Sequence, residues 1–252
     1  MTRPAEGEAL LRTSLVILLI ALCLAVPRFA GAQSSVATAF ILRDTTARIT
    51  VTNPAARRRG LCVGFVQIVR AKAAFVATAK HCIEEQASGP LGHAASLQDL
   101  GLSVVIDYAN GTRGRARYLA WNEHQDAIVL VSSFTQLPVS YARLCPGCKI
   151  YETVGIRQRI PVESILSAGA GAPVISSGIV ESDTFGRYTV ILPSSPGTSG
   201  APVLDLRGNL VGIVVSGATF RGADAGWQAG IVLGQTVYDL ARYAVEHYPD
   251  VP

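Results

Sequence analysis

The sequence predicts an all-β fold, a sandwich or a barrel, that is closed by one helix at its carboxyl end. Short runs rich in β-branched residues recur along the chain beyond its first segment. Gly, Asn, Asp and Pro interrupt these runs at frequent intervals, which is the pattern of many short strands joined by turns. Only the last segment shows apolar residues at helical spacing. With 252 residues, of which 49% are hydrophobic and 16% charged, the chain is long enough to bury a substantial core.

Seven runs have the composition of strands, and the final segment has that of a helix. The strand-like runs are 47–52, 62–69, 102–108, 127–133, 172–180, 187–193 and 209–215. Asn110-Gly111 separates two strand-like segments and predicts a hairpin with a tight two-residue turn. The segment 234–248 predicts the one helix of the mature chain, because four apolar residues share one of its faces. They are Val237, Leu240, Ala241 and Ala244.

The N-terminal segment 1–32 has the order of a secretory signal peptide. Arg3 and Arg12 precede an apolar run over 15–26, and Ala30-Gly31-Ala32 follows it as a small-residue cleavage site. The run of 12 residues is shorter than the roughly 20 that span a bilayer. An uncleaved anchor is the alternative. We therefore expect a secreted or periplasmic protein that has no membrane contact after signal cleavage.

The charge of the chain does not indicate a nucleic-acid partner. Removal of the signal takes away three arginines and two glutamates, so the formal net charge falls from +4 to +3. A charge this small is not typical of nucleic-acid binding. The one basic run, at 56–60, is interpreted as a solvated loop.

Four cysteines remain when Cys23 leaves with the signal, and an even number in an exported chain indicates two disulfides. They are Cys62, Cys82, Cys145 and Cys148. The last two lie in a Cys-Pro-Gly-Cys stretch with three interpretations: a structural disulfide, which we favour, a redox-active pair, or half of a metal site. A zinc site needs a second pair of ligands, which the four histidines do not clearly supply. We expect no metal and no other cofactor.

Ser199 lies in a turn of small residues directly before a strand-like run, and this is where reactive chemistry is expected. A serine hydroxyl is a poor nucleophile unless a base takes its proton. His81, at the end of an apolar strand, can serve as that base, and Asp126, just before another, can orient the imidazole. Small neighbours leave backbone N–H groups open to a developing oxyanion, and we assign these donors to Gly197 and Ser199.

Three stretches resemble the chymotrypsin-like (trypsin-fold) serine proteases. They are FVATAKHC, DAIVLV and PGTSGAPV with the following GNLVGIVVSG, in the chain order His, Asp, Ser. The resemblance covers about 45–248, and it implies two antiparallel six-stranded β-barrels with the active site between them. The first barrel would supply His81 and Asp126, and the second Ser199. The resemblance also implies a disulfide between Cys62 and Cys82, whose loop closure contributes about 3 kcal/mol.

This resemblance and the composition suggest five segments. They are the signal peptide at 1–32, the N-terminal barrel at 33–135, a linker at 136–149, the C-terminal barrel at 150–233, and the C-terminal helix and tail at 234–252. Because the chain ends at Pro252, soon after the tail helix, we expect a bacterial-type member without a PDZ domain.

Two departures from the family concern activation and specificity. Zymogen members carry an aspartate directly before the nucleophile, where this chain has Thr198, so we expect no activating cut. The resemblance implies a substrate pocket with Pro193 near its floor, one wall from Val215, Ser216 and Gly217, and Gly230 opposite. An uncharged floor favours a small or apolar side chain before the cleaved bond, although Asp224 lies in a nearby loop.

The sequence therefore predicts an exported, monomeric serine endopeptidase that acts on protein or peptide substrates through an acyl-enzyme. A trypsin-fold binding protein without turnover is the alternative, and the three filled positions weigh against it. A lipase-like esterase fits poorly, because its nucleophile lies in a Gly-x-Ser-x-Gly elbow and its histidine follows the serine.

Overall fold

The computed structural model of the protein describes residues 36–70, 73–87, 91, 96–121, 124–133, 159–167, 174–182, 188–192, 197–215, 219–220 and 227–248. All of them belong to one unit, Ser34–Pro252. The predicted signal peptide at 1–32 lies outside the described residues, and so do Cys145 and Cys148.

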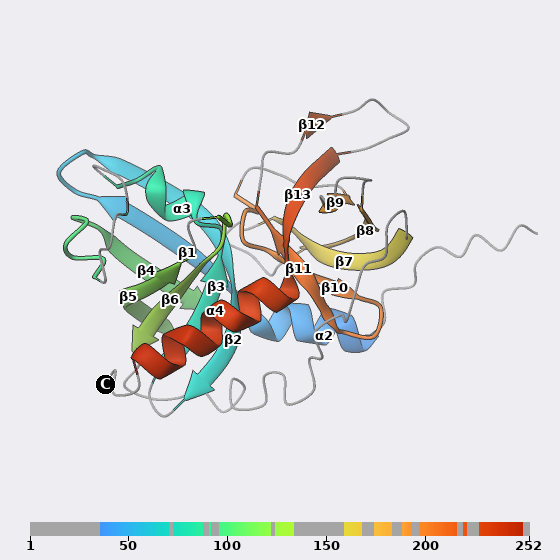
Figure 1. Cartoon of the computed structure of the whole chain (residues 1–252), viewed down its shortest axis with the longest axis horizontal. Coiled ribbons are helices and arrows are strands. Elements are labelled where there is room, and N and C mark those ends of the chain that lie inside the picture. The colour runs from blue at the N-terminus through green and yellow to red at the C-terminus, as the bar shows by residue number, and fades with distance from the viewer. Residues whose placement is uncertain are drawn as a thin grey trace, which may run out of the picture. The chain divides into compact units, whose positions relative to one another are not determined.

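Six antiparallel strands form a closed barrel in the first half of the chain, in the order β1-β2-β3-β6-β5-β4 (Figure 1). Their bounds are β1 Thr46–Asn53, β2 Arg58–Arg70, β3 Ala73–Thr78, β4 Ser103–Tyr108, β5 Arg113–Trp121 and β6 Ile128–Ser133. β1 and β4 alternate buried and half-buried side chains, as expected for strands with one face in the barrel. β3 is buried along its whole length and β6 along nearly all of it, because α4 (Gly234–His247) covers their outer face.

A second barrel follows in the second half of the chain. Its strands are β7 Arg159–Ser167, β8 Val174–Ser182, β9 Tyr188–Ile191, β10 Pro202–Asp205, β11 Leu210–Val214 and β13 Trp227–Leu233. β11 pairs with both β10 and β13, and this closes the ring, while the short β12 (Thr219–Phe220) pairs with β13. The predicted fold class, two six-stranded barrels and a C-terminal helix, is confirmed.

The hairpin predicted at Asn110-Gly111 is present between β4 and β5, but the two-residue turn is wrong. The Tyr108 N–H donates to the Thr112 carbonyl at 2.9 Å, so the loop holds three residues, 109–111. Gly111 has φ +84°, which is the left-handed residue that closes a three-residue hairpin loop. The Asn110 side chain accepts the Thr112 N–H at 3.1 Å, which favours this longer loop.

Helix α4 follows the last strand of the second barrel but packs on the first. The four predicted apolar residues of its inner face are all buried, and they belong to the core of the first barrel. Tyr248, which follows α4, stacks on the ring of Tyr118 and donates its hydroxyl proton to the Leu119 carbonyl at 3.2 Å. The carboxyl end of the chain is therefore fixed to the first barrel, although the second barrel is nearer to it in sequence.

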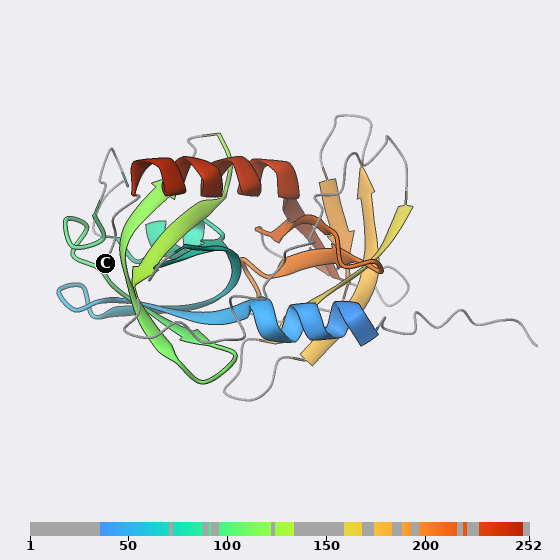
Figure 2. The same cartoon turned by 90° about the horizontal axis from the view of Figure 1, so that it is seen from below.

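A second helix, α2 (Val36–Thr45), makes the reciprocal contact, and its presence corrects the prediction of a single helix. It precedes the first barrel but packs on β7 and β10 of the second, so α2 and α4 lie on opposite sides of the two barrels (Figure 2). Its buried face contains Thr38, Leu42 and Thr45. Two of these three are polar, and the exposed side of the helix carries the apolar Phe40, so apolar periodicity does not reveal the helix. No helix in the described ranges combines the length and apolarity needed to cross a membrane.

If α2 is part of the core of the second barrel, Leu42→Ala should lower the free energy of unfolding by about 2–5 kcal/mol. Leu42 is fully buried, whereas Phe40 on the same helix is 59% exposed. Phe40→Ala should therefore change the free energy by no more than about 0.5 kcal/mol. Chemical denaturation followed by circular dichroism measures both, and equal effects would show that α2 is not part of the core.

Candidate active site

His81 stands where the buried strand β3 gives way to a single helical turn. β3 ends at Thr78. The sequence predicts a loop at His81, but in the structure the histidine is the first residue of helix α3 (His81–Glu84). Cys82 and Ile83 of this turn are buried, which anchors it on the barrel. The His81 side chain, in contrast, is 28% exposed, so its imidazole is open to an incoming molecule.

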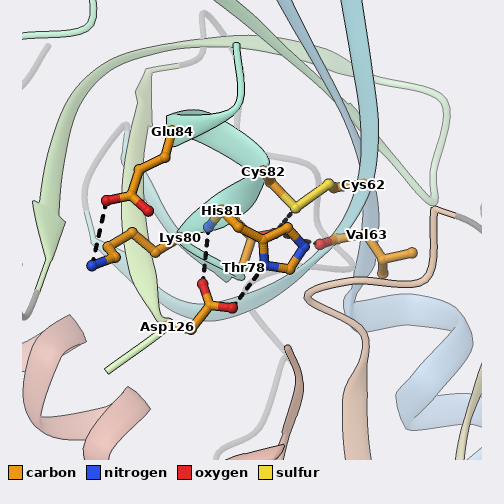
Figure 3. Close-up of polar contacts among 8 residues, drawn as sticks. All are labelled: Cys62, Val63, Thr78, Lys80, His81, Cys82, Glu84 and Asp126. Atoms are coloured by element: carbon orange, nitrogen blue, oxygen red, sulfur yellow. Dashed lines mark hydrogen bonds and ion pairs between the residues drawn. A yellow bond between two sulfur atoms is a disulfide. The ribbon is translucent and has the colours of Figure 1, made fainter. Parts of the chain in front are cut away.

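Asp126 holds His81 through two hydrogen bonds (Figure 3). Its Oδ1 accepts the His81 backbone N–H at 2.9 Å, and its Oδ2 lies 2.7 Å from the His81 Nδ1. The pairing of Thr78 with Ile128 in β3 and β6 brings together these residues, which are 45 positions apart. Since a carboxylate only accepts hydrogen bonds, Nδ1 carries the proton and the neutral imidazole keeps Nε2 as an acceptor.

The same contact makes His81 more basic than an ordinary histidine. The hydrogen bond to Asp126 raises the pKa of His81 above 6.5 and outweighs the lowering effect of partial burial. The charge of Asp126, and more weakly those of Glu85 and Glu84, add to the rise. This interaction stabilises the fold fully below about pH 6.5, and the stabilisation is lost as the pH rises through the pKa of the folded protein.

Ser199 lies in a loop that hydrogen bonds to both barrels. Its backbone carbonyl accepts the N–H of Val63 in β2 at 2.9 Å. The N–H of the next residue, Gly200, donates to the carbonyl of Val214 in β11 at 2.7 Å. The predicted nucleophile loop therefore lies at the junction of the first and second barrels, with the Ser199 side chain half-buried.

Gly200 brings this loop against the end of β3, three residues before His81. Its φ of +87° and its surroundings both exclude a side chain, because a Cβ would collide with the Val63 carbonyl oxygen and the Thr78 Oγ1. The Thr78 hydroxyl in turn donates to the Val63 carbonyl at 2.7 Å. Thr78 is fully buried and precedes His81 by three residues. The loop of Ser199 and the strand end of His81 are thus held against the same peptide group.

The backbone of the loop also offers donors where the sequence predicts an oxyanion site. Among the residues that the structure describes, no backbone carbonyl accepts the N–H of Gly197 or of Ser199, whereas the N–H groups of Gly200 and Ala201 are both bonded. Thr198 is 4% exposed, so its side chain points into the protein. The assignment of Gly197 and Ser199 as oxyanion donors stays a prediction.

The disulfide between Cys62 and Cys82, implied by the family resemblance, is confirmed. It joins the residue before Val63 to the residue after His81, and both sulfur-bearing side chains are buried. Such a bond persists in oxidising compartments, which fits an extracellular or periplasmic protein.

Of the residues predicted to line a substrate pocket, the structure describes two. The N–H of Val215 donates to the carbonyl of Gly230 at 3.0 Å, so these residues are neighbours across adjoining strands. Pro193, Ser216 and Gly217 lie outside the described residues, and so does Asp224. The roles of all five pocket residues stay predictions.

Two contributors to the site, Thr78 and the side chains around Lys80, carry no signal in the sequence pattern. The Lys80 Nζ lies 5.1 Å from the centre of the Trp121 ring and 3.4 Å from a Glu84 carboxylate oxygen. Its backbone N–H donates to the Asp126 carbonyl at 3.4 Å. These contacts stabilise the turn that presents His81. Within the described ranges, no three His, Cys, Asp or Glu side chains lie close enough together to hold a metal ion.

The chain is similar in sequence and in fold to known peptidases. The sequence profile of the trypsin-like peptidase domain matches residues 62–213, more than half of the chain. No curated protein sequence matches significantly. Among solved structures, the active form of the Rv3671c protease from M. tuberculosis superposes with a TM-score of 0.57 at 17% identity, over 84% of this chain and 86% of that one. The HtrA-type protease AlgW with a decapeptide gives 0.55 at 15% identity, over 83% and 67%. At these identities the two structures show similarity of fold.

Gly200→Ala should destabilise the protein by about 2–5 kcal/mol, because it adds a strained φ and a steric clash. Gly111→Ala is the matched control, since Gly111 has nearly the same φ but no atom within 4 Å of an added Cβ. It should cost only the strain, about 1–2 kcal/mol. Denaturation of both variants checks this, and equal losses would contradict the close approach at Gly200.

Asp126→Asn should lower the pKa of His81, because it removes both the hydrogen-bonded carboxylate and its charge. An NMR titration of the imidazole protons measures the pKa directly. Glu84→Gln should lower it much less, because Glu84 is the weakest of the contributing charges. If the Asp126→Asn protein titrated like the wild type, the hydrogen bond would not be the cause of the raised pKa.

Proposed function

The chain belongs to the trypsin-like peptidase domain family of serine endopeptidases, and on that premise we propose that it is exported and cleaves peptide bonds with His81, Asp126 and Ser199. One observation carries the assignment of these residues. The Asp126 carboxylate holds the His81 imidazole at 2.7 Å, while the loop of Ser199 packs through Gly200 on Thr78, three residues before that histidine.

The proposed reaction begins with attack of the Ser199 Oγ on the substrate carbonyl carbon, as its proton passes to the His81 Nε2. Asp126 stabilises the imidazolium that forms, in keeping with the raised pKa of His81. The N–H groups of Gly197 and Ser199 stabilise the oxyanion, and one such donor is worth about 3 kcal/mol in the transition state. His81 then protonates the leaving amine. In the second half of the reaction, water attacks the acyl-enzyme while His81 takes its proton, and His81 returns a proton to the Ser199 Oγ as the acid product leaves.

We propose that the site needs no activating cut. Thr198 replaces the aspartate with which a freed N-terminal amine pairs in zymogen members, so such an amine would have no charged partner here. The hydrogen bonds from Val63 to Ser199 and from Gly200 to Val214 support this proposal, because the uncut chain already makes them. The loop would then be formed once the protein has folded.

Specificity and location complete the proposal. Pro193 near the floor of the pocket, with Val215, Ser216, Gly217 and Gly230 on its walls, would favour a small or apolar side chain before the cleaved bond. The N-terminal segment 1–32 would direct export, and the Cys62–Cys82 disulfide supports an oxidising destination.

The decisive variant is Ser199→Ala. Wild-type protein should react with a fluorophosphonate probe and cleave peptides, whereas Ser199→Ala should not be labelled and should lose about 10⁶-fold in kcat. Ser195→Ala, in the same sequence stretch, should be labelled like the wild type. An unlabelled wild-type protein that still bound peptides would indicate the alternative, a trypsin-fold binding protein without turnover. Cleavage-site profiling of a peptide library with the same proteins then tests the pocket.

A further inference from the structure

Strand β5 carries three arginines on the outer face of the first barrel. Arg113, Arg115 and Arg117 are exposed, whereas the residues between them, Gly114 and Ala116, are buried toward the barrel interior. Alternate residues of a regular strand are about 7 Å apart, which is the spacing of Arg113 and Arg115. Arg117 lies at a bulge, because the register with β6 shifts between Ala116 and Tyr118. The three arginines therefore form a row of cations on one strand, with a regular repeat only from Arg113 to Arg115.

Most of this positive charge is not compensated. Asp107 pairs with the Nε of Arg113 at 2.6 Å and with the Nη2 of Arg48 at 2.9 Å, so one carboxylate serves two guanidinium groups. Burial acts to raise the pKa of Asp107, but the hydrogen bonds from the two arginines outweigh it and hold the carboxyl group ionised. Among the described residues, neither Arg115 nor Arg117 has an acidic partner.

The three arginines line a cavity of about 880 Å³, within the range of binding pockets. Among the described residues of its lining there is no Asp or Glu, and the other polar side chains are neutral: Ser96, Gln98, Ser103, Tyr118 and Ser133. One wall is held by the backbone, because the Leu97 N–H donates to the Arg117 carbonyl at 3.0 Å and Ser96 pairs with Tyr118. This cavity is referred to below as the arginine pocket.

The arginine pocket is separate from the candidate active site. Ser133, in its lining, is the last residue of β6, whereas Asp126 lies just before the first residue of that strand. Seven residues of extended chain span about 23 Å. A molecule bound here would leave His81 and Ser199 accessible.

We propose that the arginine pocket binds an extended acidic peptide with carboxylates at alternate residues. Carboxylates at alternate residues of such a peptide have the spacing of Arg113 and Arg115, so they can meet neighbouring guanidinium groups, with which carboxylates form strong paired hydrogen bonds. The serine hydroxyls and the Gln98 amide can bond the peptide backbone. A single-stranded nucleic acid fits less well, because it needs aromatic side chains on which bases stack, and the Tyr118 ring already stacks on Tyr248.

The test uses the full chain with Ser199→Ala, so that binding is measured without cleavage and independently of the proposed catalytic function. The first probe is a fluorescent octapeptide in which four glutamates alternate with four serines, and the second has the same residues with the glutamates contiguous. Fluorescence anisotropy should show the alternating peptide binding at least fivefold more tightly. The binding should weaken as the salt concentration rises, because exposed charges are screened.

Substitutions locate the site. Arg115→Ala with Arg117→Ala should weaken binding of the alternating peptide at least tenfold. Arg207→Ala with Arg242→Ala is the matched control, since it removes two other exposed arginines, and binding should stay within twofold. Arg115→Glu with Arg117→Glu should instead bind a peptide of alternating lysines and serines, which also shows that the variant has folded.

Several results would overturn the proposal. The first two are no binding at millimolar peptide concentration and equal affinity for the alternating and the contiguous glutamate peptides. The other two are equal losses of affinity in the Arg115→Ala, Arg117→Ala protein and in the control, and no preference of the Arg115→Glu, Arg117→Glu protein for the lysine peptide. An eight-nucleotide oligothymidylate that bound through Arg115 and Arg117 as tightly as the alternating peptide would also overturn it, in favour of a general polyanion site.

Discussion

The backbone of Val63 makes the contacts on which the candidate active site depends. Its N–H donates to the Ser199 carbonyl and its carbonyl accepts the Thr78 hydroxyl, so a single residue of β2 joins the loop of the serine to the strand that leads to the histidine. The disulfide from the neighbouring Cys62 to Cys82 fixes the same region from the other side of His81. Gly200 makes the arrangement possible, because any side chain there would push the two barrels apart.

The exchanged terminal helices hold the two barrels in the relation that this contact requires. Helix α4 follows the second barrel and buries its apolar face in the core of the first, whereas α2 precedes the first barrel and buries Leu42 in the second. Each fully buried aliphatic side chain contributes about 1.5–3 kcal/mol. Separation of the barrels would expose both helices, so the position of Ser199 relative to His81 is coupled to the stability of the whole unit.

The first barrel offers two chemically different surfaces at the two ends of β6. Just before the strand, Asp126 orients the histidine, and the acidic side chains of Glu84 and Glu85 add negative charge there. Near its end, Ser133 adjoins the row of arginines on β5, where positive charge dominates. A rigid strand keeps these two regions apart, so a partner held at the arginine pocket would neither block the candidate active site nor change the pKa of His81 through direct contact.

The sequence by itself determined the strand-rich fold, the tail helix and the candidate residues His81, Asp126 and Ser199, because alternation, turn residues and reactive side chains are local properties. It gave the hairpin at Gly111 but not its loop length, which the hydrogen bond from Tyr108 to Thr112 sets. Only the tertiary structure decided that α2 is a helix, since two of its three buried residues are threonines, and that Thr78 and Val63 adjoin the serine loop. Such contacts join residues over a hundred positions apart, and no local pattern specifies which distant backbone groups a fold brings together.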